Sequence, residues 1–286
     1  MGLDEELQAQ LDENPLDYGL EKANYVAPDV LTWPCEHFLH EHARIRSFIQ
    51  VLASSARHAD LRWKEIAQQQ LGNNADPSDS AAPPKELWDW FAEEGMGSEL
   101  MLIGQRGMIM EMVLCRSVDN FLAYVTELMA LVFQTRPQML KAAEAGEPLD
   151  TVPLDLVLQH QNMDDLIQAL TERRVDQLSR RGMRDLLKYW SKRMGFRLLE
   201  TTEAVDRMVC LIEQRNVIVH NRAVVNRIFL SKVPNSPATI GERLHLASSD
   251  VYADLGFLAG SICGIDSRAI AHFDLPHRKL PKGEFA

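Results

Sequence analysis

The chain has 286 residues, of which 46% are hydrophobic, so it can bury a substantial core and is not expected to be disordered. Its formal net charge of -11 argues against constitutive, tight, non-specific binding to nucleic acid. The four cysteines are far apart and form no CxxC pair, which is typical of reduced thiols. The N-terminus is acidic and has no apolar signal core, and no apolar run is long enough to span a membrane. We therefore expect a soluble, cytoplasmic protein.

Helical periodicity is common along the chain and strand signals are scarce, which predicts an all-α protein. The first helix is expected from about Cys35 to Leu71, with Pro34 at its start. A mobile linker is expected near residues 72–84, where breakers and small polar residues combine. A short helix anchored by apolar aromatic residues follows it: Trp88, Trp90 and Phe91.

The rest of the chain is expected to be a helical bundle. The predicted helices cover about 98–134, a short stretch from Pro137, 162–179, 183–194, 200–219 and 249–272, with a loop over 231–243. We therefore divide the chain into an N-terminal helical region, residues 1–95, of unassigned role, and a helical domain, residues 96–286.

The run from Cys35 to His42 brings His37 within helical contact distance of His40 and Glu41, which would allow a two-point metal contact. Such spacing is common on polar helix faces, and no second pair of ligands stands at a recognisable distance. We predict neither a metal site nor a cofactor.

Residues 172–197 carry nine basic side chains against three acidic ones, a local charge of +6. Four of them share one helix face by their spacing of three and four: Arg181, Arg184, Lys188 and Lys192. Tyr189 and Trp190 interleave with them, which is typical of binding to unpaired bases. The alternative is a solvated helix face whose aromatic residues belong to the core.

The run from Arg215 to His220 places an arginine, an amide and an imidazole in an otherwise apolar stretch near the end of an amphipathic helix. Asn216 and His220 share a face, whereas Arg215 and His220 point about 140° apart on an ideal helix. They can meet only if the arginine swings round, the helix ends between them or a second subunit supplies the partner. The alternative is structural: Arg215 and Asn216 cap or cross-link helices, and His220 is a core histidine.

This motif resembles that of the HEPN superfamily (higher eukaryotes and prokaryotes nucleotide-binding domains), in which an arginine, often followed by asparagine, precedes a histidine by four to six residues. Arg215, Asn216 and His220 match those positions. The flanks, residues 213–226 and 119–128, are also similar to family segments, and the resemblance covers roughly residues 100–275.

The resemblance implies a helical bundle that forms a homodimer and acts as a metal-independent endoribonuclease on single-stranded or tRNA-like RNA, in a toxin–antitoxin or antiphage setting with a regulatory protein partner. His220 would act as base or acid, Arg215 would stabilise phosphate charge, and Asn216 would orient one of them. Arg222 and Asn221 would add a phosphate contact, although Asn221 is equally suited to cap the helix. The alternative is a non-catalytic HEPN module that binds RNA or a partner protein.

Overall fold

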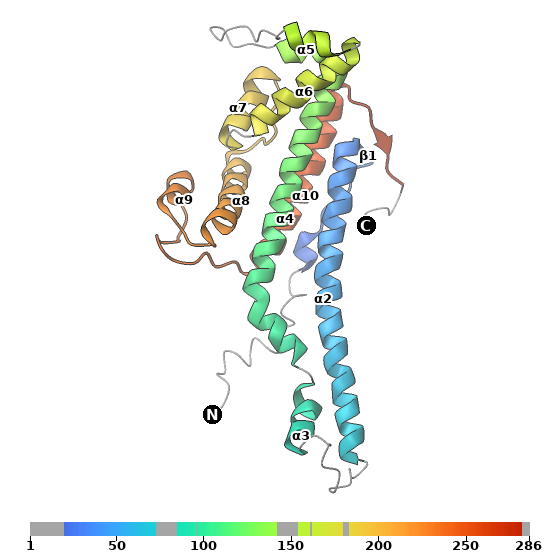
Figure 1. Ribbon diagram of the computed structural model, residues 1–286, viewed down its shortest axis with the longest axis vertical. Helices are drawn as coiled ribbons and strands as arrows, with labels where there is room; N and C mark the ends of the chain where they lie inside the picture. Colours follow the sequence, from blue (N-terminus) through green and yellow to red (C-terminus); the bar gives the residue numbers. More distant parts are fainter. Residues whose placement is uncertain are drawn as a thin grey trace.

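Three long helices run along the length of the molecule: α2 (Trp33–Gly72), α4 (Ser98–Thr135) and α10 (Ser248–Phe273) (Figure 1). The computed structural model describes residues 20–72, 85–95, 97–141, 154–160, 162–179 and 183–281. Most of these residues are helical, so the all-α prediction is confirmed. The expected linker lies outside the described residues except for Gly72.

Shorter helices cover the ends and one side of these three (Figure 1). A single turn, η1 (Leu20–Ala23), precedes α2, and α3 (Lys85–Glu94) lies at the far end of α2. After α4 come η2 (Pro137–Lys141), α5 (Leu154–Gln159), α6 (Met163–Ser179), α7 (Met183–Arg193), α8 (Thr202–Asn221) and α9 (Arg227–Lys232). Strands β1 (Val30–Leu31) and β2 (Arg278–Lys279) pair antiparallel, with Val30 opposite Lys279.

The main helix boundaries agree with the predictions because local signals set them. Pro34 stands in the first turn of α2, where its missing N–H costs nothing. Thr201 caps α8 through a 3.1 Å bond that its hydroxyl accepts from the Ala204 N–H. Helix α9 was not expected; it occupies the first two residues of the predicted 231–243 loop.

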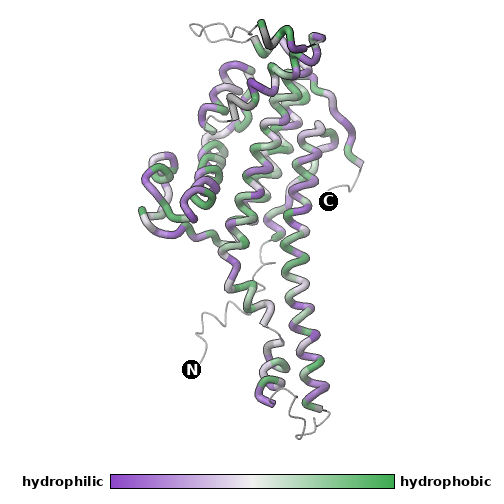
Figure 2. The backbone as a smooth tube through the Cα atoms, viewed as in Figure 1, coloured by the Kyte–Doolittle hydropathy of each residue, from purple (hydrophilic) through white to green (hydrophobic). Residues whose placement is uncertain are grey.

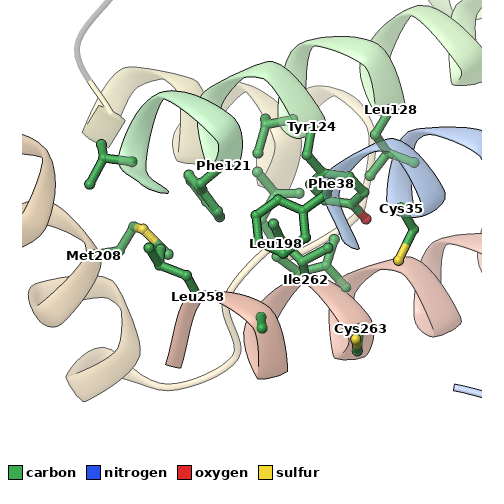
Figure 3. Close-up of a cluster of buried hydrophobic side chains, with 14 of the residues drawn as sticks. Cys35, Phe38, Phe121, Tyr124, Leu128, Leu198, Met208, Leu258, Ile262 and Cys263 are labelled. Atoms are coloured by element: carbon green, nitrogen blue, oxygen red, sulfur yellow. The ribbon is translucent and has the colours of Figure 1, made fainter. Parts of the chain in front are cut away.

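One large apolar core joins α2, α4 and α10 with the residues around α7 and α8. Figure 3 shows side chains from these segments meeting, among them Phe38 of α2, Phe121 of α4, Met208 of α8 and Leu258 of α10. The apolar side chains of the N-terminal half of α2 therefore share a core with the region after residue 95. Hydrophobic residues recur along the whole of α4, whereas the C-terminal half of α2 is mostly hydrophilic (Figure 2). No described helix is both long and apolar enough to cross a bilayer.

A buried histidine in α2 makes the fold sensitive to pH. His42 is 2% exposed, contacts the rings of Tyr25 and Phe38, and has its Nε2 3.3 Å from the Ala23 carbonyl oxygen. Burial lowers the pKa of His42 to about 4. An unfolded histidine takes up a proton near pH 6.5, so the unfolded state binds more protons between these two values, and stability falls as the pH falls through that window.

We expect the free energy of unfolding to drop by about 2 kcal/mol between pH 7 and pH 5 through His42 alone, at 1.36 kcal/mol per pKa unit. Urea denaturation of the wild type and of His42→Gln, at both pH values, measures this. The variant has no imidazole to protonate, so its drop should be smaller by that amount. Equal drops in the two proteins would show that His42 does not cause the sensitivity.

Candidate active site at the end of helix α8

Helix α8 is continuous through Arg215, Asn216 and His220 and ends at Asn221. One of the three ways in which the arginine and the histidine could meet is therefore ruled out, because the helix does not end between them. The two residues lie on different faces of the same helix, near its C-terminal end.

Arg215 swings toward α4 and is held there. Its Nε donates to Asp119 Oδ1 at 2.9 Å, and its Nη1 donates to Asn216 Oδ1 at 3.4 Å. The side chain keeps 24% exposure. A guanidinium carries five N–H donors, so donors remain for an anion after these two bonds. Asn216 thus contacts the guanidinium of Arg215.

A second arginine meets the same face of α4. Arg243 lies in the segment that returns from α9, and its Nη2 donates to Glu111 Oε1 at 2.6 Å. Glu111, Cys115 and Asp119 are four residues apart, so they form one row along α4 that receives both arginines. Burial raises the pKa of the Cys115 thiol to about 11, which keeps it protonated and unsuited to act as a nucleophile.

The turn after α8 has an unusual backbone. Arg222 and Ala223 have φ values of 53° and 61°, in the left-handed region, and the Ala223 N–H donates to the Val217 carbonyl at 3.1 Å. The Asn221 side-chain amide donates to the Val224 carbonyl. Asn221 therefore braces the turn, whereas the C-cap of α8 is Arg222, one residue later than expected. The Arg222 side chain is exposed and available to solvent.

His220 is exposed in the last turn of α8. Among the residues that the structure describes, it makes no hydrogen bond or ion pair. This exposure is at odds with the structural alternative for His220, a buried core histidine. The chain brings Arg215, Asn216 and Asp119 into contact and leaves the His220 imidazole exposed on another face of the same helix end.

Three of the four residues of the predicted basic face lie on α7: Arg184, Lys188 and Lys192. The fourth, Arg181, is outside the described residues. Arg184 pairs with Asp206 of α8 at 3.5 Å and Lys188 with Asp185 at 3.7 Å, and all four side chains are more than half exposed. Such exposed pairs contribute about 0–1 kcal/mol, so they leave both cations available. Lys192 is also exposed.

The aromatic half of that prediction is wrong for Trp190. This side chain is fully buried and packs against Phe196 and Phe273, so it belongs to the core and cannot stack on a base. Tyr189 is only half-buried, but it too packs against the core. The face that remains is a charged one without an aromatic platform.

His37 and His40, considered above for a metal, lie beside acidic residues: His37 Nδ1 is 3.4 Å from Glu127 and His40 Nε2 is 3.8 Å from Glu36. The described residues contain no group of three or more metal-ligating side chains.

Comparison with known proteins finds no matching family model, no matching curated protein and no matching solved structure.

Proposed function

We propose that the chain is a metal-independent endoribonuclease of the HEPN type. The observation that carries the proposal is that a fixed arginine and an exposed histidine lie near the same end of one helix. Arg215 is held by Asp119 and Asn216 yet keeps free donors, and His220 is exposed one and a half turns further along α8. An arginine matches the geometry and charge of a phosphate, and an imidazole can move a proton near neutral pH.

In this mechanism the ribose 2′-hydroxyl is the nucleophile, so no metal-bound water is needed. The 2′-oxygen attacks the phosphorus and the bond to the 5′-oxygen breaks, which leaves a 2′,3′-cyclic phosphate and a 5′-hydroxyl. His220 acts as base on the 2′-hydroxyl or as acid on the leaving oxygen. Arg215 stabilises the charge that develops on the phosphate, and Asn216 keeps its guanidinium oriented.

The experiment that tests the proposal is incubation of the purified chain with single-stranded RNA or tRNA in EDTA. We expect cleavage, with products that end in a cyclic phosphate. Cleavage that EDTA abolishes would show that the mechanism is wrong, and absence of any cleavage would favour the second candidate below.

The second candidate is a non-catalytic module that binds RNA or a partner protein. The ion pair between Arg215 and Asp119 favours it, because that pair also cross-links α8 to α4. In this case His220 has no role in chemistry. We further propose, on the family resemblance alone, a cytoplasmic toxin–antitoxin or antiphage setting in which a protein partner restrains the enzyme.

We also propose a homodimer with the ends of α8 near the two-fold axis. Met101, Met108 and Met112 are exposed, and their spacing of seven and four places them on one face of α4. Val219, in the last turn of α8, is a further exposed apolar side chain. Methionine suits adaptable interfaces, and a two-fold contact is self-complementary.

Light scattering on a dilute sample should give the mass of two chains, and Met108→Glu with Met112→Glu should give the mass of one. A wild-type monomer that cleaves RNA at full rate would contradict the dimer. The double variant tests the surface itself, because a dimer that persists in it must use another face.

The α7 cations should bind RNA through its phosphates. The logarithm of the RNA affinity should fall linearly with the logarithm of the salt concentration. Replacing Lys188 and Lys192 with glutamate should make this fall shallower by about 0.7 for each phosphate that is no longer neutralised, because fewer counterions are released. Reversing Lys64 and Lys85 changes the net charge equally at the other end of the molecule and serves as the control. If the double substitution on α7 leaves the slope unchanged, these cations do not bind RNA and only face solvent.

A further inference from the structure

The segment that returns from α9 is held against the end of α8, and this contact fixes the backbone of Arg243. The Leu244 N–H donates to the Ala223 carbonyl at 2.7 Å. Arg243 itself forms an isolated antiparallel bridge with Val224. Figure 1 shows the chain after α9 returning to α4 at this level. The position from which the Arg243 side chain starts is therefore set by backbone hydrogen bonds.

The side chain of Arg243 is anchored at two points and still faces solvent. Its Nη2 donates to Glu111 Oε1 at 2.6 Å, and its Nη1 donates to the Arg222 carbonyl at 3.4 Å. These two bonds leave further donors, because a guanidinium carries five N–H groups. The Arg243 side chain is 63% exposed, whereas the Glu111 side chain that holds it is 14% exposed. The guanidinium is thus held in one place with donors available to an anion.

Arg243 and Arg215 are anchored on the same row of α4. Glu111 holds Arg243 near one end of the row, and Asp119 holds Arg215 at the other. Eight residues separate the two carboxylates, which places them about 12 Å apart along the axis of α4. The contacts with α8 agree, because Arg222, whose carbonyl receives Arg243, lies seven residues or about 10 Å beyond Arg215. That separation suits two phosphates of one strand rather than a single phosphate.

The charges around this row favour an anion, although the whole chain is acidic. Three arginines stand against two carboxylates: Arg215, Arg222 and Arg243 against Glu111 and Asp119, a local charge of +1 where the chain carries -11. Each carboxylate already accepts from an arginine, and the Arg222 side chain is exposed. Arginine stays charged and its planar fork matches a phosphate, so an extended anion with repeating phosphates is the ligand that fits.

We propose that Arg243 is a second phosphate-binding residue of the site, so that the substrate is an RNA strand with one phosphate at Arg215 and another at Arg243. The inference rests on the proposed ribonuclease function. It names the substrate as a strand of several nucleotides, and not a mononucleotide or a dinucleotide. Arg243 binds the strand and takes no part in proton transfer. Because its guanidinium is already anchored, it loses little freedom when the strand binds.

The test is the affinity for a short single strand of 2′-O-methyl RNA, which carries the phosphates but lacks the hydroxyl that cleavage needs. Arg243→Gln should bind it about fivefold more weakly at ~0.1 M salt, and the fall of log affinity with log salt should be shallower by about 0.7, the effect of one phosphate contact. Fluorescence anisotropy measures both. The control is Arg116→Gln, because Arg116 also lies on α4, is 60% exposed and pairs with Glu41 of α2 at 2.7 Å. This control loses the same charge and should bind like wild type.

Glu111→Gln tests the same contact with a change in the opposite direction. Glutamine still accepts from Arg243 Nη2 but carries no charge, so the arginine keeps its place and the strand meets one negative charge fewer. This variant should bind the strand about threefold more tightly at low salt, the effect of one like charge roughly 6 Å away in water. A gain in affinity cannot come from misfolding. An unchanged affinity would show that the strand does not pass Glu111 and would overturn the inference.

The double variant, Arg215→Gln with Arg243→Gln, shows whether two phosphates are bound. Distant contacts act independently, so its loss of affinity should be the product of the two single losses. A double variant no weaker than Arg215→Gln alone, or an Arg243→Gln chain that binds like wild type or no more weakly than Arg116→Gln, would overturn the role of Arg243 and leave the ribonuclease intact. A wild type that binds the strand through Arg243 but cuts no RNA would overturn the ribonuclease and support Arg243 as a phosphate-binding residue of an RNA-binding module.

Discussion

Replacing His220 with alanine should slow RNA cleavage by about 10²–10⁴-fold, the usual loss for one general acid–base group. The side chain is exposed and makes no polar contact among the described residues, so its removal should leave helicity and oligomeric state as in wild type. Single-turnover cleavage measures the loss, with circular dichroism and light scattering on the same samples. A variant that cuts like wild type would remove His220 from the mechanism.

Arg215→Ala should do nearly the same damage for a different reason, because it removes a cation that stays charged and fits a phosphate. Arg215→Lys keeps the charge but loses the forked geometry, so we expect only partial recovery. The partly exposed pair with Asp119 contributes about 0–1 kcal/mol, so neither variant should unfold the chain. If Arg215→Ala binds and cuts RNA normally, the arginine is only a cross-link between α8 and α4, as in the interaction-module hypothesis.

The Asp119→Asn variant tests whether Asp119 only positions Arg215 or also takes part in the reaction. Asparagine can still accept the bond from Arg215 Nε but carries no charge, so the guanidinium keeps its place without its counter-ion. If Asp119 only positions Arg215, cleavage by this variant should stay close to that of wild type, whereas Asp119→Ala should reduce it.

Most of the helices could be predicted from the sequence because each is set by local signals. Helix α4 was expected over residues 98–134 and spans Ser98–Thr135, since its apolar side chains recur with helical spacing. Helix α9 was missed because six residues show hardly two turns of periodicity. Its one local signal is Asn226, whose Oδ1 accepts from the Phe229 N–H at 2.9 Å. The burial of Glu213, which pairs with Lys232 of α9 at 2.8 Å, depends on contact between two helices.

The candidate site was predictable only along α8. Arg215, Asn216 and His220 stand in one helical run, so their relative directions follow from helix geometry. The row of Glu111, Cys115 and Asp119 on α4 and the returning segment with Arg243 meet that helix through long-range folding, and no spacing in the sequence links them. The same limit explains Trp190, because a tryptophan among cations looks the same in sequence whether it faces solvent or the core.

A buried carboxylate ties the start of α2 to α10. Asp266 is fully buried, and its Oδ2 accepts from the Thr32 N–H at 2.9 Å. Its Oδ1 accepts from the Thr32 hydroxyl at 2.5 Å and from the Tyr124 hydroxyl at 3.3 Å. Burial raises the pKa of Asp266, and the bonds from Thr32 and Tyr124 oppose that rise. Thr32 in turn accepts from the Cys35 N–H at 3.4 Å, so the same residue caps α2.

Asp266→Ala should therefore lower the free energy of unfolding by about 3–6 kcal/mol, because it leaves three buried donors unpaired at about 1–3 kcal/mol each, reduced where water reaches them. That is a large part of the 5–15 kcal/mol typical of a folded protein. Urea denaturation at pH 7 measures this loss.

Tyr124→Phe is the matched control. It removes one donor and the longest of the three bonds to Asp266, and should cost about 1 kcal/mol. Asp266→Asn should fall between the two, because an amide still accepts from Tyr124 and from the Thr32 hydroxyl but turns its own N–H toward the Thr32 N–H. Asp266→Ala could instead lose no more free energy of unfolding than Tyr124→Phe. In that case the three hydrogen bonds of the buried carboxylate only offset the free energy that its desolvation costs.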